Sequence, residues 1–147
     1  MSGKTGIKPQ RHLPLEGSYN IRDLGGYQSS NGSVTHWKTI LRSGDMHSLT
    51  LESQAELVDY GVRTVVDLRK DTELEEKPNG FADSPGIAYH HHDVWGDLLA
   101  PDRSDYENAV SWLLAHYSLL LDEHRSQICD AIITVVDLDN WPVVFHG

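Results

Sequence analysis

Six charged or hydroxyl side chains lie where short apolar segments of the chain end or turn, and such places can hold an anion. They are Arg22, Asp23, Arg42, Ser43, Asp67 and Arg69. The ends of strands in α/β folds often face a ligand site. Arginine can bind two oxygens of a phosphate at once. These positions are therefore candidates for a small anion site, with local turns and salt bridges as the alternative.

The overall charge restricts what that ligand can be. Twelve Lys and Arg against 22 Asp and Glu give a net charge of −10. A broad nucleic-acid surface needs clustered basic residues, so nucleic acid is excluded as a partner. A phosphate site in this chain must be a local exception, built from a few arginines and backbone N–H groups.

Metal and disulfide chemistry have little support in the sequence. In a strand, only His90 and His92 of the His90-His91-His92 run share a face, and two imidazoles do not complete a metal site. We therefore expect no metal and no cofactor. Cys129 is the one cysteine, so no disulfide forms within the chain. Its place within an apolar helical segment predicts a small buried core residue.

The first half of the chain contains one clear helix and one clear strand. Thr50 is a suitable N-cap for a helix that Gly61 ends. Leu51, Ala55 and Val58 fall on one face of that helix. The β-branched run at 62–68 is typical of a buried strand in an α/β sheet. Asn31-Gly32 is a strong hairpin signal, which predicts an antiparallel pair between Tyr27 and the stretch 34–41.

The second half alternates helices and strands in the same way. We expect a loop or frayed helix at 70–85, a strand at 87–92 and another strand at 142–146. A helix capped within 102–105 should run to 121 with an apolar stripe, and a second helix should cover about 124–137. The stripe comprises Val110, Leu113, Leu114, Tyr117, Leu120 and Leu121. This alternation predicts one α/β domain at 15–147, with a central, mainly parallel sheet flanked by helices, after an N-terminal arm at 1–14.

Four segments carry a more specific signal when they are taken together. They are LEGSYNIRDLGGY at 15–27, LRSG at 41–44, GVRTVVDLR at 61–69 and PVVFH at 142–146. Their order and spacing resemble the bacterial and fungal tyrosine/serine phosphatases, a group with dual-specificity and lipid phosphatase members. That family reads roughly N-F-R-D-L-G-G-Y, L-x-R-S, T-V-I-D-L-R and then P-V-L-x-H-C-x-A-G-K-D-R-T-G. Ile21 replaces the usual Phe, which is a mild change.

The resemblance implies roles for individual residues. Asp67 is a candidate general acid, with the alternative that Asp67 and Arg69 form a pair that fixes the following loop. Arg22 and Asp23 would border the phosphate site, with an Asx turn and a surface salt bridge as the alternative. Arg42 and Ser43 would face the site, unless Arg42 only pairs with a nearby carboxylate such as Asp45. His146 would orient the catalytic loop, and Gly147 occupies the position of the family's nucleophilic cysteine.

The departure from the family falls at Gly147. Such phosphatases attack phosphorus with a thiolate, and glycine has no side chain to attack with. The resemblance therefore implies an incomplete tyrosine-phosphatase-like fold that stops before the catalytic loop. The enzymatic interpretation is an N-terminal part of a cysteine-dependent phosphatase for phosphorylated protein, lipid or small molecules. The alternatives are a non-catalytic remnant that binds a ligand or partner, and a partner-dependent scaffold.

The remaining expectations concern the protein's surroundings. No stretch of 18 apolar residues and no apolar leader occur, which favours a soluble, cytoplasmic protein without a membrane span. The strand at 143–145 should lack part of its cover, so a second chain or a swapped copy would complete the fold.

Overall fold

A five-stranded mixed sheet forms the centre of the computed structural model, which describes residues 8–147. The strands are β1 (Arg22–Asp23), β2 (Ile40–Arg42), β3 (Thr64–Asp67), β4 (Ala88–His91) and β5 (Val143–His146), in the spatial order β1-β2-β5-β3-β4. The last four strands of that order run parallel, and β1 pairs antiparallel with β2. The predicted α/β class is thus confirmed. The predicted parallel pairing of the segments at 62–68 and 143–146 is confirmed as well.

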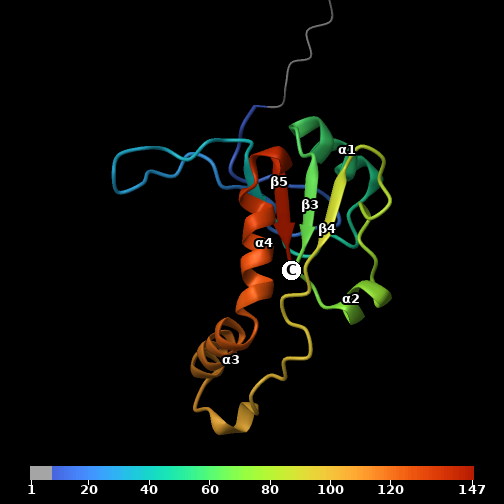
Figure 1. Ribbon diagram of the computed structural model, residues 1–147. Coiled ribbons are helices and arrows are strands. Elements are labelled where there is room, and N and C mark those ends of the chain that lie inside the picture. The colour runs from blue at the N-terminus through green and yellow to red at the C-terminus, as the bar shows by residue number, and fades with distance from the viewer. Residues whose placement is uncertain (1–7) are drawn as a thin grey trace, which may run out of the picture.

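Helices cover both faces of this sheet. They are α1 (Leu51–Tyr60), α2 (Asp71–Glu76), α3 (Ala109–Glu123) and α4 (Arg125–Val136), with 3-10 turns η1 (Arg103–Asp105) and η2 (Leu138–Asn140). Figure 1 shows α4 in front of the sheet and α1 behind it, with α3 extending away from the strands. The main core lies on the α1 side, where Leu57 and Tyr60 cluster with Val65 and Val144. Alternation along β3 turns the neighbouring Val66 to the α4 side.

The ends of α1 follow local signals, but its buried face differs from the expectation. Thr50 Oγ1 accepts a hydrogen bond from the Ser53 N–H at 3.2 Å, and Gly61 ends the helix with φ 123°. Leu51 and Val58, however, are exposed, so the predicted face was wrong. The buried residues are Ser53, Leu57 and Tyr60. Two stripes of helical spacing occur in α1, and the one that carries Leu57 and Tyr60 faces the core.

The apolar stripe predicted for α3 faces outward, which is a second correction. Most of its members are exposed, namely Val110, Leu113, Leu114, Tyr117 and Leu121, and Leu120 alone is buried. The helix begins after Asn108, whose side chain caps it, rather than within 102–105. The inner side of α3 instead places His116 against Trp95, with 5.0 Å between ring centroids.

Two further expectations about the second half were wrong. Cys129 is exposed, because the side of α4 that meets the sheet carries Ala131 and Ile128, and Cys129 lies about 100° away around the helix. The strand β5 keeps most of its cover, since Val143 and Val144 are completely buried and Phe145 alone of the three residues is half-buried. Many of the exposed large apolar side chains lie on α3 and α4 instead.

The N-terminal segment joins the core before residue 14. The first seven residues of the expected arm at 1–14 lie outside the described part of the chain. Leu13 is buried, and its N–H donates to Ile21 O at 3.0 Å. The Asn-Gly signal corresponds to a projecting hairpin in which Gln28 and Val34 form a bridge (Figure 1). Across residues 8–147, none of the helices combines the length and apolarity that crossing a bilayer requires.

Candidate active site

The carboxyl ends of the two central strands bring Asp67 and His146 side by side. These residues are register partners in the β3–β5 pair, and the Leu68 N–H donates to His146 O at 2.8 Å. The chain turns directly after Asp67, because its Oδ1 accepts the Arg69 N–H at 3.1 Å. The turn folds the Arg69 side chain back onto the carboxylate. The contact agrees with the alternative that Asp67 and Arg69 form a pair, but it arises from this turn and not from strand alternation, because β3 ends at Asp67.

Asp67 and Arg69 form a buried, bidentate ion pair. Arg69 Nε donates to Asp67 Oδ1 at 3.0 Å, and Nη2 donates to Oδ2 at 2.8 Å. Asp67 is completely buried, and the Arg69 side chain is 3% exposed. The hydrogen bonds with Asp67 raise the pKa of Arg69. A third Arg69 donor, Nη1, reaches Lys77 O at 3.0 Å and Asp45 Oδ1 at 3.3 Å.

Three further side chains surround the Asp67 carboxylate. Tyr89 Oη donates to Oδ2 at 2.9 Å, and Asn79 Nδ2 donates to the same oxygen at 3.2 Å. His146 Nε2 lies 3.3 Å from it. Burial alone would raise the pKa of Asp67, but the contacts with His146 and Arg69 outweigh burial and hold that pKa well below its ordinary value. Asp67 is therefore an ionised carboxylate surrounded by donors.

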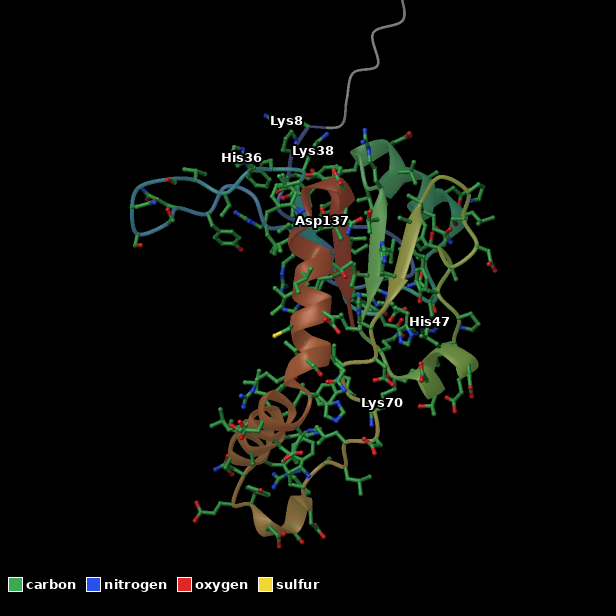
Figure 2. All side chains as sticks on the ribbon, in the orientation of Figure 1. Lys8, His36, Lys38, His47, Lys70 and Asp137 are labelled. Atoms are coloured by element: carbon green, nitrogen blue, oxygen red, sulfur yellow. The ribbon has the colours of Figure 1, made fainter. Side chains whose placement is uncertain are left out.

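Asp45 connects this pair to a second polar group. Its Oδ2 lies 2.6 Å from His47 Nδ1, and Ser48 Oγ lies 2.8 Å from His47 Nε2. Burial opposes the charge on Asp45, but hydrogen bonds from His47 and the Arg69 guanidinium lower its pKa overall. Asp45, His47 and Ser48 border a cavity of ≈ 510 Å³ that Ser18 also lines. Figure 2 shows His47 at the end of the sheet where Figure 1 marks the C-terminus.

A separate cavity opens beside the end of β5. It has a volume of ≈ 310 Å³, and its lining includes Arg69, Lys70, Trp95, His116 and Gly147. Figure 2 shows Lys70 at this end of the sheet. A Cβ built on Gly147 would lie 3.3 Å from Leu68 Cβ, so a side chain fits there after a small shift of Leu68. Position 147 thus combines access to a cavity with two nearby cations.

Asp23, which the sequence also singled out, lies farther from this centre. It is completely buried and accepts hydrogen bonds from the Gly25 N–H, the Lys38 N–H and Tyr60 Oη at 2.7–2.8 Å. The first of these bonds is the Asx turn that the sequence allowed as an alternative. Tyr60 ends α1 just before β3 begins, so Asp23 lies toward the amino end of the parallel strands.

Arg22, Arg42 and Ser43 lie beside the carboxyl end of β5. Arg22 and Arg42 are register partners across β1 and β2, and Arg42 is also the partner of Phe145. The Ser43 N–H donates to Phe145 O at 3.0 Å. Within residues 8–147 Arg42 makes no ion pair, so the alternative that it pairs with Asp45 was wrong.

The histidine run has hydrogen-bonding roles. His91 Nε2 lies 2.8 Å from Arg69 O, and His92 Nε2 lies 2.9 Å from Thr134 Oγ1. Burial lowers the pKa of His92. In the described part of the chain, no group of three or more His, Cys, Asp or Glu side chains is placed to hold a metal ion.

Sequence reasoning missed Asn79 and Tyr89, which complete the surroundings of Asp67. They lie 12 and 22 residues after it along the chain. The Pro78-Asn79-Gly80 turn signal could have drawn attention to Asn79, since this residue type often bonds to backbone in turns. No local signal distinguishes Tyr89 from any other aromatic residue in a strand.

Comparisons with known proteins agree with the resemblance found in the sequence. The model of a family described as the tyrosine phosphatase family matches residues 13–147. A comparison with curated proteins finds no match. The matched region includes all five strands, both cavities and each of the predicted site residues.

Proposed function

The chain belongs to the tyrosine phosphatase family, and we propose that its domain serves cysteine-dependent hydrolysis of phosphate monoesters. In this chemistry a thiolate attacks phosphorus, the ester oxygen leaves with a proton, and water then hydrolyses the phosphocysteine to inorganic phosphate. The observation that carries the proposal is the location of position 147. It follows the central strand β5, accepts a side chain and lines a cavity with Arg69 and Lys70.

Residue 147 is a glycine, so it does not supply the nucleophile that this chemistry needs. Gly147 follows His146, and Cys129, the one cysteine of the sequence, is exposed on α4. The proposed reaction therefore needs a thiol and a ring of backbone N–H groups placed after His146. Residues 13–146 would supply the supporting part of the site.

Asp67 fits the role of an anchor better than that of a proton donor. A general acid must hold a proton at working pH, and the contacts of Asp67 keep its pKa low. Its oxygens already accept hydrogen bonds from Arg69, Asn79 and Tyr89. We therefore favour the alternative in which Asp67 and Arg69 fix the loop beside position 147. The general-acid role stays a prediction.

The side chains around position 147 would accept more than one class of phosphorylated substrate. Arg69 and Lys70 line the cavity beside position 147. Because the Arg69 charge is already paired with Asp67, Lys70 would supply most of the positive charge for a phosphate. Asp23 would not contact the substrate and would instead stabilise the turn that follows β1. The substrate would be a phosphorylated protein, lipid or small molecule, with phosphotyrosine and phosphoserine both accepted. Further contacts to it would come from the neighbouring strand ends, through Arg22, Arg42 and Ser43.

The proposed location of the reaction is the cytoplasm. The sequence contains a single cysteine, so no disulfide within the chain depends on an oxidising compartment. A thiolate nucleophile works only where thiols stay reduced, and the cytosol keeps them so.

A second candidate function is a non-catalytic module that depends on a partner. What favours it is the apolar surface of α3 and α4, where Leu114, Ile133 and Val110 are each more than 60% exposed. Large apolar side chains exposed together on two neighbouring helices would fit contact with other polypeptide. A second chain or a swapped copy would pack on these two helices in either function.

Sequencing the transcript through and beyond codon 147 separates the two functions. The enzymatic proposal expects the reading frame to continue past codon 147 and to encode a stretch like A-G-K-D-R-T-G. A stop codon directly after codon 147 in every transcript would contradict the enzymatic proposal and favour the partner-dependent module.

A further inference from the structure

Asn79 contacts three partners at the carboxyl end of the central strands. It is 4% exposed. Its Oδ1 accepts the Phe81 N–H at 2.9 Å. Its Nδ2 lies 2.8 Å from His146 Nε2 and 3.2 Å from Asp67 Oδ2. The amide therefore joins a backbone turn, a buried histidine and a buried carboxylate.

These partners allow one orientation of the amide. The Phe81 N–H can only donate, so it requires Oδ1 on its side. The ionised Asp67 carboxylate can only accept, so it requires Nδ2 on the other side. Exchanging Oδ1 and Nδ2 would set donor against donor and acceptor against acceptor in a buried place. Asn79 thus presents both of its N–H groups to Asp67 and His146.

The orientation of Asn79 determines the protonation of His146. With an N–H of Asn79 directed at Nε2 from 2.8 Å, Nε2 must accept and carry no proton. A neutral imidazole then carries its proton on Nδ1. An imidazolium would place an Nε2–H against the Asn79 N–H. The 3.3 Å contact between His146 Nε2 and Asp67 Oδ2 is therefore no ion pair while Asn79 is present.

A neutral His146 that accepts at Nε2 no longer helps to lower the pKa of Asp67, and the contact with Arg69 then keeps the carboxylate ionised. The bidentate Arg69 guanidinium, at 2.8–3.0 Å, and the Tyr89 hydroxyl, at 2.9 Å, both favour the ionised carboxylate. Asp67 therefore stays an acceptor when the imidazole is neutral, and it continues to hold the Asn79 amide in the same orientation.

Asn79 is also the group that decides between two possible states of the ring. Without its donor, the remaining close partner of Nε2 is the Asp67 carboxylate, which would draw a proton onto Nε2. The ring would then become the other tautomer or an imidazolium. Among residues 8–147, His146 Nδ1 has no hydrogen-bond partner although the residue is 1% exposed. A proton on Nδ1 makes this atom a buried donor.

We propose that Asn79 is a positioning residue that fixes His146 as the neutral Nδ1–H tautomer. The side chain that precedes position 147 then offers a hydrogen-bond donor and adds no positive charge beside it. The consequence for catalysis rests on the proposed function, because it concerns the nucleophile placed after His146. The tautomer itself is a property of the described chain and can be measured without any activity.

The test is nitrogen NMR of the 147-residue chain labelled with ¹⁵N-histidine. Long-range proton–nitrogen correlations show which ring nitrogen carries the proton, and His146→Gln identifies the His146 signals among those of the nine histidines. At pH 7 we expect a protonated Nδ1 and an unprotonated Nε2. Asn79→Asp keeps an acceptor for the Phe81 N–H but removes the donor to His146. In this variant Nε2 faces two carboxylates, and we expect it to become protonated.

Asn140→Asp is the matched control. Asn140 Nδ2 donates to Thr134 O at 2.9 Å, away from His146, so this change should leave the His146 pattern as in the wild type. In Asn79→Ala, Nε2 should also become protonated, because the Asp67 carboxylate alone then faces it. The inference is overturned if wild-type His146 carries a proton on Nε2. It is likewise overturned if both Asn79 variants keep the wild-type pattern.

Failure of the inference and failure of the proposed function give different results. A wrong tautomer in the wild-type spectrum refutes the role of Asn79 whatever the chain catalyses. The expected tautomer supports that role even if no phosphatase activity is found. The tautomer of wild-type His146 can be read without either Asn79 variant, so an Asn79 variant that precipitates does not remove the test.

Discussion

The substitution Asp67→Ala removes the buried carboxylate and should lower the free energy of unfolding most directly. In Asp67→Ala, the Arg69 guanidinium stays buried, at 3% exposure, without its bidentate partner. Asp45 lies 3.3 Å from Arg69 but is 39% exposed, so it compensates only in part. Breaking a buried ion pair from one side costs about 3–5 kcal/mol. Since a whole domain is stable by about 5–15 kcal/mol, we expect a loss of that size to remove a large share of the free energy of unfolding.

Urea unfolding followed by tryptophan fluorescence measures this loss. The urea concentration at which half of the protein is unfolded should fall. The slope of the unfolding free energy against urea concentration should stay the same, because the surface exposed on unfolding is unchanged. Asp122→Ala is the matched control, since Asp122 pairs with Arg125 at 3.6 Å and both side chains are more than 70% exposed. The control should change stability by no more than about 0.5 kcal/mol. A cost for Asp67→Ala as small as that of the control would refute the anchoring role.

Three further predictions concern pH, the thiol and the exposed helices. The pKa of Asp67 is lowered in the folded chain and is about 3.9 in the unfolded chain, so its stabilisation is complete above the unfolded pKa and is lost as the pH falls toward the folded pKa. Between pH 5 and pH 3 the wild type should therefore lose more stability than Asp67→Asn in the urea assay, and equal losses would mean that the pKa is not lowered. The 147-residue chain should not hydrolyse p-nitrophenyl phosphate, and turnover that Cys129→Ser abolishes would show a misplaced nucleophile. The chain should self-associate in size-exclusion chromatography, and Leu114→Glu on α3 should shift it toward monomer; a wild-type monomer that unfolds cooperatively above about 55 °C would contradict the need for a partner.

Local signals in the sequence were sufficient for the positions of most elements. Thr50 and Gly61 determine where α1 begins and ends through contacts within a few residues. The apolar run around Val65 predicted a buried central strand, and the closeness of Asp67 and Arg69 in the chain suggested their pairing. Such features depend on residues close in the chain, which periodicity and capping rules describe.

The faces of the helices could not be predicted in the same way. Helical spacing identifies an apolar stripe, but it does not identify what the stripe packs against. In α1 the competing stripe of Leu57 and Tyr60 meets the core, and in α3 the stripe around Leu113 and Leu114 faces outward. The burial of Cys129 was mispredicted for the same reason. The contacts between elements decide these cases, and they join residues far apart in the sequence.

The candidate site shows the same division. Asp67 and His146 were identified because both end predicted strands and match motifs of the resembled family, and the structure places these strands side by side. Asn79 and Tyr89 reach Asp67 from a loop and an edge strand, so their roles depend on tertiary packing. Asp23, in contrast, carries a strong motif and yet holds a turn at the other end of the strands.

Hydrolysis of p-nitrophenyl phosphate by a completed chain tests the phosphatase function most directly. The chain would carry Gly147→Cys and would be continued with the rest of the catalytic loop and the following helices of another member of the family. We expect a burst of about one p-nitrophenolate per protein followed by turnover, and neither in the matched chain with Gly147→Ser. A folded Gly147→Cys chain that hydrolyses no faster than its Gly147→Ser counterpart would contradict the proposal that residues 13–146 form the supporting part of a phosphatase site.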